Sequence, residues 1–337
     1  MPTTDLAEGG LTLEQAAKRL GVSPSTVSRY LQLNRLVGAY RTDSGYFIPK
    51  DVKVSPTLRT AHIPRLHRYA WRAEPLVVAV WNQAGGAGKT TLCREIAFLA
   101  GQWGLRVLVC DLDAQANLTS WSGVEEVALG DTLYEFIAKE GALPPAQERH
   151  GYELYPSGLA FDAVNSELTA DLMLAAAQGR AGTKIMRLRQ ALRAMPKDLI
   201  LLDGPPNITP IVTAMLLAAH ELILPVEVGR KGLEGADAVL QMLNSAKGFG
   251  AVPLRPRVVV PTKFSPSVSE AHGYLATLQN LFAAEITAPL NLRVSPYSSA
   301  QTHAVPLGVA DASSLAAAEM IEVAESVLGR LGFKELS

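Results

Sequence analysis

The chain has 337 residues, of which 48% are hydrophobic and 19% charged, and this composition excludes a disordered or fibrous protein. The length exceeds that of an ordinary single domain and indicates two domains. The formal net charge of −1 provides no overall field that would attract nucleic acid or membranes. The charge is unevenly distributed, because residues 1–73 hold eleven Lys and Arg against five acidic residues. We therefore expect a basic amino-terminal segment of net charge +6, followed by an acidic body of −7.

Cys93 and Cys110 are the two cysteines, too few for a disulfide framework or a four-thiolate metal site. Both lie in apolar stretches, so we expect buried core residues. The first ten residues lack the basic and apolar regions of a signal peptide, and no apolar run is long enough to span a membrane. These features predict a cytoplasmic protein.

A short amphipathic helix is predicted directly after Thr12. Thr12 and Gln15 have the spacing of a capping box, in which each side chain bonds the backbone N–H of the other residue. The residues that follow place apolar side chains at helical spacing, on Leu13, Ala16, Ala17 and Leu20.

A second helix is predicted to begin at Ser23, a typical N-cap residue, with Pro24 in its first turn. Val27 and Leu31 would face the first helix. The outward positions are then polar or basic: Ser25, Thr26, Ser28 and Arg29. Two helices joined by a short turn form a helix-turn-helix, whose second helix can enter the major groove of DNA.

A hairpin or wing is predicted next, because two β-rich runs flank residues 43–45, and it would place Arg41 beside the groove. Residues 11–49 resemble the winged helix-turn-helix of MerR-type regulators and excisionases. We assign residues 1–50 to this DNA-binding domain. A helical hairpin used for dimerisation is the alternative interpretation.

Residues 51–73 contain two prolines, five Lys and Arg and one acidic residue, a composition typical of a basic linker. Such a linker could lie along DNA phosphates. The alternative is a strap that packs on the body through Ile63, Leu66 and Trp71. The body is then residues 74–337.

A phosphate-binding loop is predicted at the start of the body. An apolar strand over Leu76–Trp81 leads into a glycine-rich loop, and a helix follows from Leu92. Backbone N–H groups of such a loop, together with the helix N-terminus, bind phosphate oxygens. The candidate nucleotide-binding residues are Gly85, Gly86, Ala87, Gly88, Lys89, Thr90 and Thr91. Lys89 would reach the β- and γ-phosphates, and the Thr90 hydroxyl would be a ligand of Mg²⁺. The strict phosphate-binding pattern GxxxxGK(S/T) is not matched at its first glycine, because residue 83 is Gln.

Further apolar runs predict more strands, and two of these runs end in an aspartate. Arg106–Asp111 and Leu199–Asp203 are predicted strands, and two more are expected at Glu221–Val228 and Arg257–Lys263. Strands that alternate with helices predict an α/β fold with a doubly wound, mostly parallel sheet. Asp203, at the carboxyl end of its strand, is expected to hold Mg²⁺ through water.

The body resembles ParA-type ATPases of the deviant Walker A class, a superfamily that includes ParA, Soj and MinD. The matching segments run in family order: residues 82–91, VCDLDAQANLT, LILLDGPP, LILPVEV and PLNLR. The resemblance implies ATP and Mg²⁺ as cofactors, and an ATP-sandwiched homodimer that binds DNA without regard to sequence in association with the nucleoid. It also implies a ParB-like activator protein as a partner.

The same resemblance implies roles for single residues. Asp113 would position or activate the attacking water beside Lys89, and these two are the catalytic candidates. Thr262 and Pro289 are candidates for the adenine pocket, and Arg293 for a DNA contact. A turn or capping carboxylate is the alternative for Asp113, and a surface ion pair is the alternative for Arg293.

Ala84 departs from the family pattern, in which a lysine at this position reaches the phosphates of the partner subunit. A methyl group offers no charge, and loss of such a cation can slow phosphoryl transfer by about 10³ to 10⁵. Arg230 or Lys231 could replace it in trans. Otherwise the chain binds ATP but hydrolyses it slowly, or Ala84 is an engineered change.

Two functions fit these features. The first is a partition ATPase for plasmids or chromosomes that could also repress its own operon through the helix-turn-helix. The alternative is a nucleotide-switched transcriptional regulator with little or no ATPase activity. A membrane-patterning ATPase is disfavoured, because Glu319, Glu322 and Glu325 would lie on the polar face of the carboxy-terminal helix and be repelled by anionic lipids. No membrane partner is therefore expected.

Overall fold

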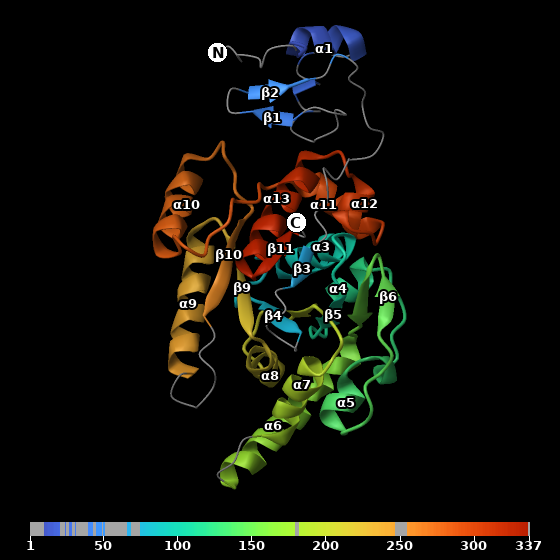
Figure 1. The fold of residues 1–337 in the computed structure, drawn as a ribbon. Helices are drawn as coiled ribbons and strands as arrows, with labels where there is room; N and C mark the ends of the chain where they lie inside the picture. The colour runs from blue at the N-terminus through green and yellow to red at the C-terminus, as the bar shows by residue number, and fades with distance from the viewer. Residues whose placement is uncertain are drawn as a thin grey trace. The chain divides into compact units, whose positions relative to one another are not determined.

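The computed structural model describes residues 10–20, 24, 27–28, 31, 40–42, 45–48, 50, 66–68, 75–178, 182–246 and 255–335. The chain divides into two compact units (Figure 1). The first contains residues 1–63 with 311–318, and the second contains residues 64–310 with 319–337. Each has a hydrophobic core of its own.

The first unit begins with helix α1, Leu13–Leu20. The Gln15 N–H donates to Thr12 Oγ1 at 3.0 Å, and the Thr12 N–H donates to Gln15 Oε1 at 2.9 Å, so the predicted capping box is confirmed. A small core forms between this helix and the residues after it, from Ala16, Ala17, Val27, Leu31 and Ile48. Burial of Val27 and Leu31 confirms the predicted inner face of the second helix.

A hairpin follows, as predicted. Strands β1, Tyr40–Thr42, and β2, Gly45–Phe47, are antiparallel, with Tyr40 opposite Phe47 and Thr42 opposite Gly45. Gly45 therefore belongs to the second strand and not to the turn. Asp43 and Ser44 lie outside the described residues.

The second unit is built on a seven-stranded sheet, in the order β10-β9-β4-β8-β5-β7-β6. Its strands are β4 Leu76–Val80, β5 Val107–Asp111, β6 Gln147–Arg149, β7 Tyr152–Tyr155, β8 Leu199–Asp203, β9 Glu221–Glu227 and β10 Pro256–Thr262. All pairings are parallel except that of β6 with β7. Strands β4, β5 and β8 are buried along their whole length, which explains their unbroken apolar runs. The predicted doubly wound, mostly parallel sheet is confirmed.

Helices cover both faces of this sheet. They are α3 Lys89–Gln102, α4 Asn117–Trp121, α5 Tyr134–Ala138, α6 Ala163–Ala177, α7 Thr183–Arg193, α8 Pro210–Ala218, α9 Arg230–Ala246, α10 Ser269–Leu281, α11 Val294–Thr302, α12 Leu307–Ala310 and α13 Leu315–Arg330, with 3-10 turns at Leu129–Asp131 and Leu159–Asp162. Val77 and Ala79 of β4 share a core with side chains of α7, α8 and α9. Helix α3 contacts β4, β5 and β8 and lies on the side of the sheet away from α7 and α8 (Figure 1). Cys93 and Cys110 are fully buried, as expected.

The segment expected as a linker is partly a strand of the second unit. Leu66–Arg68 forms β3, which pairs antiparallel with β11, Phe333–Glu335, so that Leu66 lies opposite Glu335. The linker interpretation of residues 51–73 therefore has to be shortened at its carboxyl end, because these residues have a partner strand. Ile63 and Trp71, named for the strap alternative, lie outside the described residues.

Within the described part of the chain, we find no helix that combines the length and the apolar character needed to cross a bilayer.

Candidate functional site

The loop between β4 and α3 has the backbone of a phosphate-binding loop. Gly86 and Gly88 have φ values of +77° and +87°, which residues with a side chain rarely adopt. Gly88 is the N-cap of α3, so the free N–H groups of the first helical turn open at the loop. This backbone offers several N–H donors to one anion.

Lys89 is the first residue of α3 and is 7% exposed. Its Nζ donates to the carbonyl oxygen of Ala84 at 3.1 Å, which folds the side chain back along the loop. Burial lowers the pKa of Lys89, while the nearby carboxylates of Asp203 and Asp113 raise it. A lysine in this position can exchange its carbonyl partner for a phosphate oxygen.

Asp111 and Asp203 end the neighbouring strands β5 and β8. Burial, and then the negative charge of Asp111, raise the pKa of Asp203 well above its usual range, opposed by a hydrogen bond from Thr90 and the charge of Lys89. Asp203 Oδ1 is buried and has no hydrogen-bond partner among the described residues. A hydroxyl and a carboxylate with an unused oxygen are the hard oxygen donors that Mg²⁺ prefers. The pair Thr90 and Asp203 therefore fits a magnesium site.

Asp111 was not singled out in the sequence, although it is the first acid of the DLD segment. Its carboxylate accepts from the N–H and hydroxyl of Thr119, at 3.0 and 2.7 Å, and from the N–H of Asp113 at 3.1 Å. Burial raises the pKa of Asp111 to about 7 in spite of these bonds. Asp111 thus orients the turn that carries Asp113.

Asp113 lies in that turn, and its Oδ1 accepts from the N–H of Gln115 at 2.9 Å. The turn role considered as its alternative is thus present, whereas the N-cap of α4 is Ala116. Asp113 also lines the cavity beside the phosphate-binding loop, where a carboxylate can orient a water molecule. The two roles use different lone pairs of the same carboxylate.

A cavity of about 500 Å³ opens over the loop. Nine of the candidate residues line it: Gly85, Gly86, Gly88, Lys89, Thr90, Thr91, Asp113, Thr262 and Arg293. Ala87, Asp203, Pro289, Arg230 and Lys231 do not line it. The cavity is also lined by residues that the sequence did not single out as site residues: Trp121, Lys263, Leu290 and Tyr297. Its volume is within the range of small-molecule sites.

Thr262 and Pro289 were both expected at an adenine pocket. Thr262 Oγ1 donates to the carbonyl oxygen of buried Ala87 at 3.0 Å, and this bond ties the end of β10 to the loop. Pro289 is half-buried outside the cavity, and the next residue, Leu290, lines the cavity instead. The backbone of Leu290 is held in place because its N–H donates to the carbonyl oxygen of Pro261.

Ala84 lies against helix α9. Its N–H donates to Asn82 Oδ1 at 2.9 Å, while the fully buried Asn82 donates to the carbonyl oxygen of Pro225 at 2.7 Å. A Cβ placed on Gly235 of α9 would come within 3.1 Å of the Ala84 methyl group. The loop therefore packs closely on α9 at the position where a lysine was expected.

The two proposed substitute cations lie at the start of α9. Arg230 is highly exposed and forms an ion pair with Glu234 at 2.9 Å, one turn further along the helix. Lys231 is also exposed. Within this subunit neither reaches the cavity, so any role would have to be toward a second copy.

Lys263 is the cation that the sequence analysis missed. It follows Thr262 at the end of β10 and lines the cavity, and a Cβ placed on Gly86 would be 3.4 Å from its Nζ. The same Nζ lies 3.2 Å from Glu227 Oε2, at the end of β9. In the sequence, the one signal for a role of Lys263 in the site was its position at a strand end, next to Thr262.

Arg293 precedes α11 and forms an ion pair with Glu319 of α13 at 2.6 Å. Asn291 Nδ2 donates to the same carboxylate at 2.8 Å. The pairing with Glu319 raises the pKa of Arg293. The ion-pair alternative is thus observed, although the guanidinium remains partly exposed and lines the cavity.

The DNA-binding candidates of the first unit are only partly described. Ser28 is half-buried. Arg41 lies in β1 opposite Tyr46. Ser25, Thr26 and Arg29 lie outside the described residues.

The sequence matches a family described as an AAA domain over residues 76–249 and one described as a helix-turn-helix over residues 6–32. The first match spans about half of the chain and contains the phosphate-binding loop, Asp113 and Asp203.

Individual relatives agree with this assignment. A probable plasmid-partitioning protein ParA from Thermus thermophilus is 30% identical over 308 residues, which cover 88% of this chain and 85% of the relative. The chromosome-partitioning ATPase Soj of the same organism is 31% identical, and the match covers 66% of this chain and 85% of Soj. An ATP complex of a McdA variant from Cyanothece has a TM-score of 0.64 at 23% identity, and the match covers 78% of this chain and 98% of that chain. This last likeness concerns the fold.

Proposed function

The chain belongs to the ParA/Soj family of partition ATPases, and from this premise we propose that it is an ATP-dependent, DNA-binding ATPase that segregates plasmids or chromosomes. The observation that carries the proposal is the cavity over the loop between β4 and α3. There Lys89, Thr90 and Asp113 line one space, and the buried Asp203 is hydrogen-bonded to Thr90. This arrangement can bind a triphosphate and position water beside it.

The residues of this chain divide the chemistry among them. The N–H groups of the loop and Lys89 would hold the phosphates, with Gly85, Gly86, Ala87, Gly88, Thr90 and Thr91 as the remaining contacts. Asp113 would orient the attacking water and accept its proton. Thr262 and the segment of Pro289 would border the adenine, with Leu290 and not Pro289 itself facing the cavity.

Magnesium would be held by the Thr90 hydroxyl, with Asp203 acting through water. A bound Mg²⁺ neutralises charge that develops on the phosphate oxygens. Asp203 would keep the Thr90 side chain oriented by accepting its hydroxyl proton in the hydrogen bond.

ATP would close a homodimer. The family lysine at position 84 is replaced by alanine, so we infer slow hydrolysis, with Arg230 or Lys231 as the cations that a second copy could present. Both are exposed at the start of α9, which is the condition that such a role requires.

The DNA contacts would be of two kinds. The closed dimer would bind DNA without regard to sequence through Arg293, and a ParB-like protein would trigger hydrolysis and release. The helix-turn-helix of residues 1–50 would bind an operator through Ser25, Thr26, Ser28, Arg29 and Arg41. The ATPase domain then starts near residue 64, since β3 pairs with β11.

A nucleotide-switched transcriptional regulator is the second candidate, favoured by the helix-turn-helix match together with Ala84. The two candidates differ in where the nucleotide-dependent DNA contact resides.

The test is binding of the full chain to random-sequence duplex with Mg·ATP, with Mg·ADP and without nucleotide, over a series of salt concentrations. A partition ATPase should show an ATP-dependent, salt-sensitive component. Lys89→Ala is the matched control, because it leaves the helix-turn-helix intact and should remove only that component. Equal binding in all nucleotide states would favour the regulator.

A further inference from the structure

Lys263 lies next to the phosphate-binding loop, at the point where β9 and β10 end. It follows β10, and its Nζ would be 3.4 Å from a Cβ on Gly86, in the middle of the loop. Thr262, directly before it, is bonded to the carbonyl oxygen of Ala87. The backbone that carries Lys263 is therefore fixed to the loop.

The backbone of Lys263 is unusual. Its φ of +54° lies in the left-handed region, which is uncommon for a lysine and costs free energy compared with a glycine. Such outliers persist where the surrounding structure holds them, and they are concentrated at ligand sites. A lysine is thus kept at a position whose backbone conformation glycine would adopt more easily.

The ion pair that Lys263 forms is weak. Its ion pair with Glu227 has side chains that are 40% and 37% exposed, and exposed pairs contribute little to stability. Glu227 ends β9, whose position in the sheet does not depend on this pair. An incoming anion of higher charge can therefore capture the ammonium group at small cost.

The other cations that line the cavity are engaged more firmly. Lys89 is buried and bonded to the loop, while Arg293 is held by two oxygens of Glu319. Among the described residues that line the cavity, Lys263 is the remaining Lys or Arg. It also approaches the loop at Gly86, two residues after Ala84, where the family cation is missing.

We propose that Lys263 binds the β- and γ-phosphates of ATP from within the same subunit, exchanging Glu227 for the nucleotide. It supplies positive charge to the ground state of the bound triphosphate, and it does so without a second copy of the chain. This inference rests on the proposed function, since it concerns the same nucleotide site.

The experiment compares full-length variants by calorimetric titration with Mg·ATP and Mg·ADP. Lys263→Met keeps the length of the side chain and removes its charge, and Lys263→Arg keeps the charge. Glu227→Gln is the matched control, because it breaks the same ion pair and leaves the lysine. Urea unfolding of each variant verifies the fold.

The expected result for Lys263→Met is a loss of about ten-fold or more in Mg·ATP affinity, with a smaller loss for Mg·ADP, since a charged hydrogen bond to phosphate is removed. Lys263→Arg should recover most of the lost Mg·ATP affinity. Glu227→Gln should bind Mg·ATP at least as tightly as the parent. Equal affinities of Lys263→Met and the parent would overturn the inference, as would an equal loss in Glu227→Gln. If the parent itself binds no nucleotide, the proposed function fails instead.

Discussion

Asp111 and Asp203 lie opposite each other in the register of β5 and β8, and both are about 1% exposed. Asp111 has three hydrogen-bond donors around it, whereas Asp203 has an oxygen without a partner among the described residues. Two adjacent buried carboxylates repel each other when both are ionised. Ionising both carboxylates therefore costs free energy, and a cation bound between them would lower that cost.

Asp203→Asn should stabilise the protein without nucleotide by about 1–2 kcal/mol, because it removes a buried carboxyl group whose ionisation is opposed by burial and by Asp111. The same change should abolish the increase in thermal stability that Mg·ATP gives the parent. Thermal unfolding with and without Mg·ATP measures both effects. Asp198→Asn is the contrasting variant, since Asp198 accepts two hydrogen bonds from the Arg106 side chain and its loss should destabilise. Destabilisation by Asp203→Asn would contradict this account.

Ala84→Lys should raise the rate of ATP hydrolysis at least ten-fold, because it restores a cation at the position where the family uses one across the dimer. Single-turnover hydrolysis at saturating protein measures the rate. Ala84→Met is the control, since it places a similar chain next to Gly235 without the charge. If both variants turn over as slowly as the parent, the missing lysine does not limit hydrolysis.

Arg293→Ala should weaken ATP-dependent binding to random DNA and lower the slope of log affinity against log salt by about 1, as expected for one lost phosphate contact. Breaking its partly exposed pair with Glu319 should cost no more than about 1 kcal/mol. Arg106→Ala is the control, because it removes another ion-paired arginine, directly before the amino-terminal end of β5, whereas the cavity lies at the carboxyl ends of the strands. An unchanged slope in Arg293→Ala would remove Arg293 from the DNA interface.

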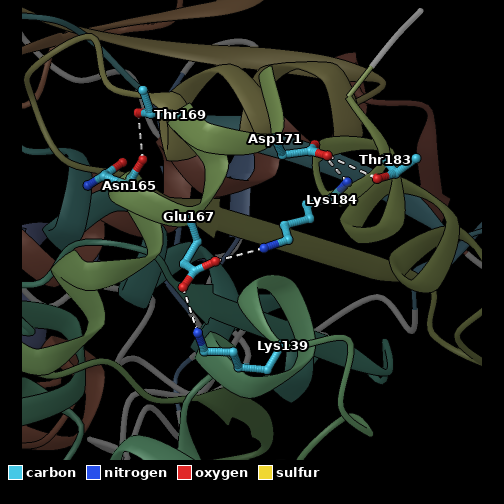
Figure 2. A network of polar contacts seen from close by, with 7 residues as sticks. All are labelled: Lys139, Asn165, Glu167, Thr169, Asp171, Thr183 and Lys184. Carbon is cyan, nitrogen blue, oxygen red and sulfur yellow. Dashed lines mark hydrogen bonds and ion pairs between the residues drawn. The ribbon is translucent and has the colours of Figure 1, made fainter. Parts of the chain in front are cut away.

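Glu167 of α6 connects the end of α5 with the start of α7 through two lysines. Figure 2 shows its carboxylate between Lys139 and Lys184. The carboxylate oxygens lie 2.6 Å from Lys139 Nζ and 2.8 Å from Lys184 Nζ. Hydrogen bonds from these lysines lower the pKa of Glu167 to about 2. Because the folded-state pKa lies below the unfolded value of about 4.3, the pair stabilises the fold above that value and loses this effect as the pH falls toward 2.

Urea midpoints of the parent and of Glu167→Gln should therefore differ at pH 7 and converge as the pH falls from about 4 to about 2. The buried aspartates are common to both proteins, so their titration cancels in the comparison. A constant difference across this range would show that the ionised form of Glu167 does not contribute.

Arg94 and Glu95 form a fully buried ion pair at 2.7 Å. Arg94 also donates to the Trp121 carbonyl oxygen, and Glu95 accepts from the Leu307 N–H. Arg94→Met should destabilise the protein by about 3–5 kcal/mol, because it leaves a buried carboxylate without its partner. The double variant with Glu95→Gln should recover much of this loss, since the amide oxygen still accepts from Leu307. Urea unfolding measures both, and equal stabilities of single and double variants would refute the argument.

Much of the fold could be predicted because its signals are local. The capping box of Thr12 and Gln15 spans four residues, and the glycines of the phosphate-binding loop stand next to Lys89 and Thr90. Asp203 was predicted at a strand end by the apolar run before it. The interpretation of residues 51–73 as a linker failed at Leu66–Arg68, because the pairing partner of that strand is at the other end of the chain.

The sequence by itself determined the elements, the loop and the acidic strand ends, since each depends on periodicity or on neighbouring residues. Only the tertiary structure decided which of these elements meet. The approach of Lys263 to Gly86, the pairing of Arg293 with Glu319 and the packing of Ala84 on Gly235 all depend on strand order and helix placement. These contacts join residues far apart in the chain, and the burial of apolar surface over the whole domain, which no short segment records, holds them together.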